Sequence, residues 1–119
     1  MPPTRHLRAC CCAALIALSF AAPAAAVTAT GRLQVIHLDV GQGDGALIIS
    51  PLGQTVLIDE GPSGVTPAMG VTVVNQLKAL GITHVDYHFA SHYHSDHVGN
   101  LPGIVAGGIS IGYGWDRGG

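Results

Sequence analysis

A short histidine-rich stretch, Ser91–His97 (SHYHSDH), constrains this chain more than any other feature. It places three imidazoles and a carboxylate within six positions, and these are ligands that a borderline ion such as zinc accepts. In an extended segment the side chains at i and i+2 share a face, so His92 and His94 can bind one ion together. Asp96 and His97 follow a bend and can turn towards a second ion. The spacing of this histidine stretch therefore predicts a centre for two Zn²⁺ ions rather than a polar loop.

The first 26 residues are predicted to be a signal peptide. A basic start containing Arg5 and Arg8 precedes an apolar run over 9–20, and small residues up to Ala26 offer a cleavage site. The alternative is an uncleaved membrane anchor, although the apolar run is short for a bilayer. All three cysteines fall inside this segment, so no thiolate remains as a zinc ligand. We expect a secreted or periplasmic protein that has no membrane contact after cleavage.

The mature chain, from Val27 onwards, is acidic. It carries three basic residues against seven acidic ones, a net charge of −4. This balance predicts no stable nucleic-acid binding, which needs a basic surface. A phosphate-bearing substrate stays compatible, because bound divalent cations reverse the local charge.

The residues after the signal read as a small sheet. Three β-rich segments, at 32–40, 46–50 and 55–59, are separated by turn sequences at 41–45 and 51–54. This spacing predicts an antiparallel meander. Apolar residues on both faces of the first and third segments predict a sheet that is covered on each side.

Mixed α/β structure is predicted for the remainder. A helix should begin at Thr66, before Pro67, and end at Gly81, which can adopt the left-handed conformation. A strand over 84–90 then leads into the histidine stretch. A helix over 101–106 and a short strand over 109–113 should follow, with a glycine-rich tail after them.

The histidine stretch, together with the apolar segment 85–90 before it and Val98–Leu101 after it, resembles the metallo-β-lactamase superfamily. The resemblance implies an α/β fold, an αβ/βα sandwich of two sheets between helix layers. It covers the first half of that fold, from Leu33 to Asn100. Residues 27–119 are therefore expected to be the N-terminal half of such a domain, truncated at the C-terminus.

The resemblance also implies roles for individual residues. His92 and His94 would ligate the first metal, and Asp96 and His97 the second. Asp96 would further help to position an attacking zinc-bound hydroxide, as the catalytic residue. Asp59 matches a supporting aspartate that is not itself a ligand.

The run from Asp39 to Asp44 (DVGQGD) more specifically resembles the metallo-hydrolase domain of ComEC-type competence proteins and their secreted relatives. It implies an exported hydrolase of phosphodiesters, either small molecules or nucleic acid. The glycines of Gly41–Gly45, here called the glycine loop, allow backbone amides to face an anion, with Asp44 in support. The alternative for this loop is a hairpin turn with a capping aspartate.

A second reading of the whole chain is a truncated or degenerate metal-binding module without catalytic activity. Members of the superfamily usually supply a later histidine, a bridging aspartate and a final histidine, and no histidine follows His97. We therefore expect this chain alone to bind zinc weakly and to turn over little substrate.

Other ring-bearing residues have less specific surroundings. His37, His84 and His88 lie among apolar neighbours and are predicted to be hydrogen-bonded structural histidines rather than ligands. Tyr113 and Trp115 either line a substrate pocket or belong to an exposed tail.

Overall fold

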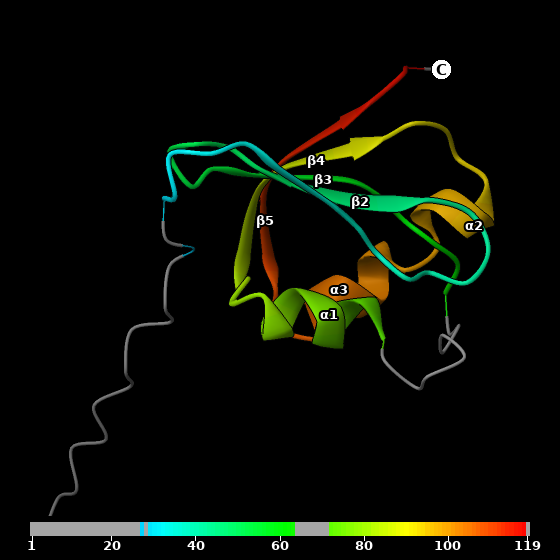
Figure 1. Cartoon of the computed structure of the whole chain (residues 1–119). Coiled ribbons are helices and arrows are strands. Elements are labelled where there is room, and N and C mark those ends of the chain that lie inside the picture. The colour runs from blue at the N-terminus through cyan, green and yellow to red at the C-terminus, as the bar shows by residue number, and fades with distance from the viewer. Residues whose placement is uncertain (1–26, 28, 64–71, 119) are drawn as a thin grey trace, which may run out of the picture.

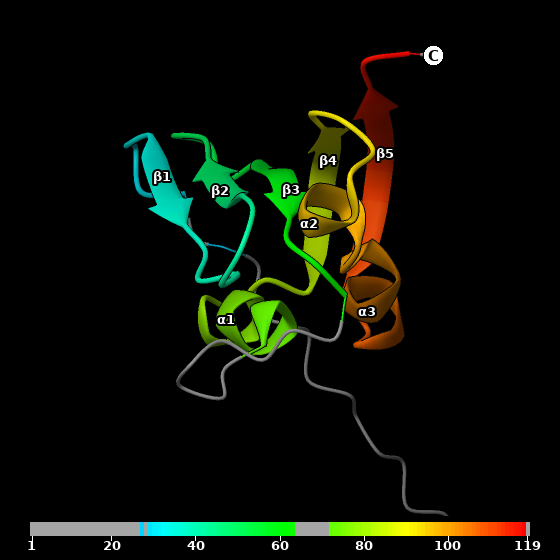
Figure 2. The same cartoon turned by 90° about the vertical axis from the view of Figure 1, so that its right-hand side faces the viewer.

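The computed structural model describes residues 27, 29–63 and 72–118. Within these ranges one sheet has the strand order β1-β2-β3-β4-β5 (Figures 1 and 2). The strands are β1 (Gln34–His37), β2 (Gly45–Ile49), β3 (Thr55–Glu60), β4 (His84–Ala90) and β5 (Ser110–Asp116), and the helices are α1 (Val73–Ala79), α2 (Ser95–Val98) and α3 (Leu101–Ala106).

The sheet is mixed. Strands β1, β2 and β3 form the predicted antiparallel meander, whereas β3–β4 and β4–β5 pair in parallel. Parallel neighbours need a crossover connection, and α1 and then α2 with α3 lie in the two crossovers. The carboxyl ends of β3, β4 and β5 consequently lie at one edge of the sheet. This edge carries the histidine stretch.

The three helices lie on the same side of the sheet (Figures 1 and 2). Apolar side chains from this face and from α1 and α3 form the core, which comprises Leu38, Val40, Leu47, Ile49, Leu57, Val73, Leu77, Ile82, Val85, Ile104 and Ile109. Within the described ranges, helices cover this face alone. The predicted cover on both sides is therefore seen on one side only, and Phe89, Tyr113 and Trp115 are exposed.

Helix α1 is held by specific caps. The Thr72 side chain accepts a hydrogen bond from the backbone of Asn75 at its start. At its end Gly81 has φ +77, and the Ile82 amide donates to Leu77 at 2.9 Å, which is the Schellman arrangement. The predicted end is confirmed. The predicted start at Thr66 and Pro67 lies outside the described residues.

Strand β5 corrects the expectation of a glycine-rich tail. Its pairing with β4 continues to Ala90↔Asp116, three residues beyond the predicted end at Tyr113. Tyr113 stacks on Tyr87 with ring centroids 5.9 Å apart, and Trp115 stacks on Phe89 at 6.4 Å. The sequence alternates glycine with aromatic residues, a weak strand signal by itself, so tertiary pairing decides the conformation.

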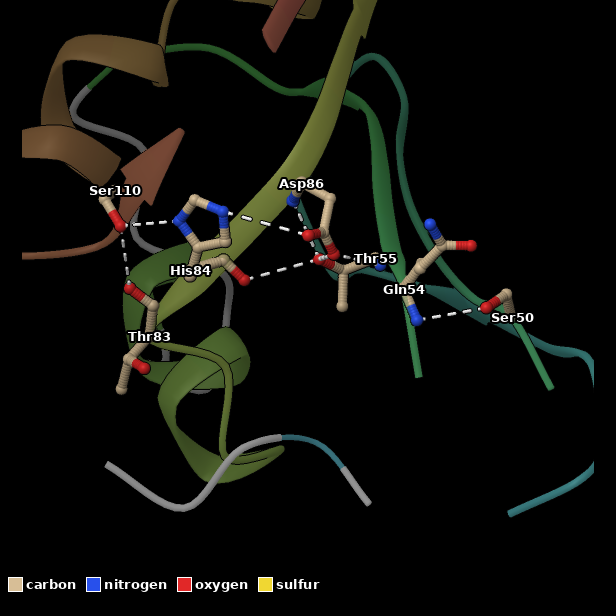
Figure 3. Close-up of polar contacts among 7 residues, drawn as sticks. All are labelled: Ser50, Gln54, Thr55, Thr83, His84, Asp86 and Ser110. Atoms are coloured by element: carbon tan, nitrogen blue, oxygen red, sulfur yellow. Dashed lines mark hydrogen bonds and ion pairs between the residues drawn. The ribbon is translucent and has the colours of Figure 1, made fainter. Parts of the chain in front are cut away.

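A cluster of polar side chains lies at the end of the sheet opposite the histidine stretch (Figure 3). The Asp86 carboxylate accepts hydrogen bonds from the backbone N–H and the hydroxyl of Thr55, at 2.7 and 2.9 Å. The backbone N–H of Thr55 is the main cause that holds the pKa of Asp86 below its ordinary value. His84 hydrogen-bonds Ser110 at 2.7 Å, which confirms its structural role. The cluster ties β3, β4 and β5 together.

No helix in the described part of the chain is long and apolar enough to span a bilayer.

Candidate metal centre

The histidine stretch leaves the sheet at the end of β4 and turns into α2. His94 has extended backbone angles, φ −67° and ψ 145°, and is the N-cap of α2, which begins at Ser95. The two halves of the stretch therefore differ in conformation, as the sequence predicts for His92 and His94 on one side of a bend and Asp96 and His97 on the other. The one-turn helix itself was not anticipated.

Asp59 anchors this stretch to the end of β3. Asp59 is 2% exposed, and its carboxylate accepts hydrogen bonds from the Ser91 amide at 2.8 Å and the Ser91 hydroxyl at 2.6 Å. A third contact, 2.8 Å long, joins it to Nδ1 of His97. Burial alone would raise the pKa of Asp59, but the hydrogen bonds from Ser91 and His97 outweigh it and lower that pKa. The aspartate therefore stays ionised beside His97.

The Asp59 residue also has an unusual backbone conformation. Its φ is +51°, the left-handed region that aspartate tolerates better than most residues. The register between β2 and β3 shifts at the same place, between Gly45 and Ala46. This irregularity at the strand end accompanies the turn of the Asp59 carboxylate towards the histidine stretch.

Three imidazoles of the stretch lie against one another. The ring centroids of His92 and His94 are 4.7 Å apart in an edge-on arrangement, and those of His92 and His97 are 3.9 Å apart. Nδ1 of His92 lies 3.0 Å from the Ser91 hydroxyl. The fold thus brings together the histidines that the sequence singles out.

The pKa of His97 is raised. Its hydrogen bond to Asp59 is the main cause that raises the pKa of His97, and the negative charges of Asp59, Asp96 and Asp44 raise it further. Because Nδ1 is held by the Asp59 carboxylate, Nε2 is the nitrogen left for a ligand.

The glycine loop packs directly on α2. Gly43 has φ +86°, and a Cβ built on it would lie 1.7 Å from the backbone oxygen of Asp96. Only glycine fits this approach. The loop is capped by Asp39, whose carboxylate accepts from the Gly41 amide at 3.3 Å. The capping role considered for Asp44 therefore falls to Asp39, while the charge of Asp44 acts on His97.

The donor types at this site fit a zinc ion, because imidazole nitrogen and carboxylate oxygen are among its usual ligands. Their convergence is incomplete: across the described residues, no three side chains of histidine, cysteine, aspartate or glutamate are arranged to hold one ion. The His92 and His94 pair would supply two of the three protein ligands that catalytic zinc generally takes. The assignment of His92, His94, Asp96 and His97 as ligands stays a prediction.

A buried histidine and glutamate form a hydrogen-bonded pair beside the site, and the sequence analysis singled out only the histidine. Nε2 of His88 lies 2.7 Å from Oε2 of Glu60, and the two residues are 4% and 0% exposed. The predicted structural role of His88 is confirmed. Glu60 was not singled out, although an acidic residue ending the apolar strand TVLIDE is a signal that could have drawn attention.

Comparison with models of protein families matches residues 38–109 to the metallo-beta-lactamase superfamily. Comparisons with curated proteins and with solved structures gave no match. The matched range is more than half of the chain and contains the glycine loop, Asp59 and the whole histidine stretch. The chain therefore belongs to the metallo-beta-lactamase superfamily.

Proposed function

We propose that this chain is an exported, zinc-dependent hydrolase of phosphodiesters. The observation that carries the proposal is the contact of three imidazoles at the carboxyl end of β4, with one of them held by the ionised Asp59. Membership of the superfamily makes metal-dependent hydrolysis the expected class of reaction. Two Zn²⁺ ions are the proposed cofactors.

In this proposal, different residues of the histidine stretch bind the two ions. His92 and His94 would hold the first ion, and Asp96 and His97 the second. Bound zinc lowers the pKa of a coordinated water to about 7 and so supplies a nucleophile at neutral pH. Asp59 fixes the His97 ring, and Asp96 would accept a hydrogen bond from the attacking water and orient it.

The choice of phosphodiesters rests on the glycine loop. Its sequence resembles that of ComEC-type proteins, and it packs on the backbone of Asp96, inside the predicted site. Its backbone amides would face an anionic substrate group. The acidic mature chain favours small phosphodiesters or a passing nucleic-acid strand over stable nucleic-acid binding.

Export is proposed from the sequence of residues 1–26, which has the order of a basic start, an apolar run and small residues. The mature protein would then act in the periplasm or outside the cell, without a membrane contact of its own.

The test compares two single-histidine variants. His94→Ala should lower zinc affinity sharply in calorimetric titration, whereas His37→Ala, an exposed histidine on β1, should leave it unchanged. Affinity should also fall steeply below about pH 6, because protonated imidazole cannot ligate a metal. Equal losses in the two variants would show that the site lies elsewhere.

Activity is assayed on bis(p-nitrophenyl) phosphate, single-stranded DNA and a chromogenic cephalosporin with excess zinc. We expect slow, zinc-dependent turnover of the phosphodiesters that His94→Ala abolishes, since the described residues leave the first ion a ligand short. Zinc binding without any turnover would favour the non-catalytic module. Cephalosporin as the best substrate would overturn the choice of phosphodiesters.

A further inference from the structure

A groove of about 470 Å³ lies beside the histidine stretch, between the ends of β4 and β5 and the start of α3. Its apolar wall is formed by Val98, Leu101 and Pro102. Tyr93, which stands between two of the predicted zinc ligands, lines the groove as well. One part of a substrate could therefore occupy this groove while its reacting group lies at the candidate metal centre.

A buried polar residue also lines this groove. His88 is 4% exposed and donates from Nε2 to the Glu60 carboxylate, with 2.7 Å between the atoms. We assign the Nε2–H tautomer because an ionised carboxylate can only accept. In this tautomer Nδ1 carries a lone pair, and the hydrogen bonds found among the described residues include none to it. Glu60 Oε1 is buried and has no hydrogen-bond partner among the described residues.

The outer end of the groove presents acceptors too. The Asp116 carboxylate accepts a hydrogen bond from the Gly118 amide at 2.7 Å. No lysine or arginine among the described residues lines the groove. Acceptors without a cation disfavour an anion and favour a ligand that donates hydrogen bonds.

Gly114 gives the groove its depth. A Cβ built on this residue would meet nothing within 4 Å, so the space beside the strand is open. The residue lies in β5 between two exposed aromatic residues and pairs with His88 across the parallel ladder. A Cβ at position 114 would enter this space without meeting a neighbour.

We propose that this groove binds an uncharged heterocycle that carries an amino group, such as the base of an adenine or cytosine nucleotide. A flat ring suits the apolar wall, and its amino hydrogens suit the acceptors of His88 and Asp116. This inference rests on the proposed function, since the base would be the part of a phosphodiester substrate that is not hydrolysed.

Binding is measured on the metal-free chain with adenosine as the probe. Isothermal titration calorimetry measures occupancy of the groove. Adenosine should give a saturable heat of binding. Purine riboside, which lacks the amino group, should bind about tenfold more weakly, because one hydrogen bond to a buried acceptor is lost.

Gly114→Leu should weaken adenosine binding at least about tenfold while the melting temperature does not fall, since glycine in a strand is itself destabilising. Tyr113→Leu, one residue away and outside the groove lining, should bind adenosine as the parent does. Unchanged binding in Gly114→Leu, or equal binding of the two nucleosides, would overturn the proposal. Because no zinc is present, the result is independent of whether the chain hydrolyses phosphodiesters.

Discussion

Replacing Asp59 with asparagine should disable the candidate metal centre while leaving its shape intact. Asparagine has the size of aspartate and tolerates the observed φ of +51°. The aspartate accepts from Nδ1–H of His97 and so leaves a lone pair on Nε2. An asparagine amide would instead donate to Nδ1, which moves the proton to Nε2 and removes the lone pair that a metal needs.

The magnitude follows from the contacts of Asp59. Losing an orienting partner of a ligating histidine commonly costs about 10- to 100-fold in metal affinity, and we expect this loss for zinc. The Ser91 amide keeps an acceptor, but the contacts at 2.6 and 2.8 Å to Ser91 and His97 lose their charged partner. The free energy of unfolding should therefore fall by about 2 kcal/mol.

Calorimetric zinc titration and urea unfolding measure the two effects separately. Asp86→Asn is the matched control, because Asp86 also accepts from a backbone N–H and a hydroxyl, at the opposite end of the sheet. It should lose stability and keep its zinc affinity. If Asp59→Asn binds zinc within twofold of the parent, His97 does not ligate the metal through Nε2.

Three further predictions concern other parts of the chain. The stability difference between the parent and Asp86→Asn, about 1 kcal/mol after allowing for solvent exposure, should be full at neutral pH. It should vanish as the pH falls from the ordinary value of 3.8 through the lowered pKa of Asp86, and melting curves across pH 2–7, roughly, measure it. Gly43→Ala should destabilise the fold and weaken zinc binding, because its Cβ would collide with the backbone of Asp96, whereas Gly31→Ala, at φ +71° with nothing within 4 Å, should cost only about 1 kcal/mol in urea unfolding. N-terminal mass analysis of exported protein should find Val27 as the first residue, and an intact Met1 would contradict the signal peptide.

Local signals in the sequence predict much of the fold. Strand β4 and helix α3 have the predicted bounds, and Gly81 ends α1 as its type suggests. In each case neighbouring residues decide the conformation, through β-branched and aromatic residues, an early proline or a left-handed glycine. The predicted end of β5 was wrong because residues that alternate with glycine give only a weak local strand signal. Pairing with β4 extends the strand to Asp116.

The candidate site was predictable in composition and not in arrangement. The spacing of the histidine stretch indicates a metal centre. Spacing cannot show that Asp59 hydrogen-bonds both Ser91 and His97, which are 32 and 38 residues away. That aspartate entered through the family resemblance. Glu60 was missed since its partner His88 is 28 residues distant, and no local pattern links the two.

The long sequence separation of the Asp59 contacts bears on the order in which the protein folds. Strands β1 to β3 close through short turns, so they can form early, whereas the pairing of β3 with β4 must first close the loop that contains α1. The histidine stretch becomes positioned only after that pairing. A ligand whose contacts form only after the transition state would leave the folding rate unchanged and slow unfolding. Zinc would then lower the unfolding rate of the folded protein, and this would be visible as a lowered unfolding arm in a chevron plot.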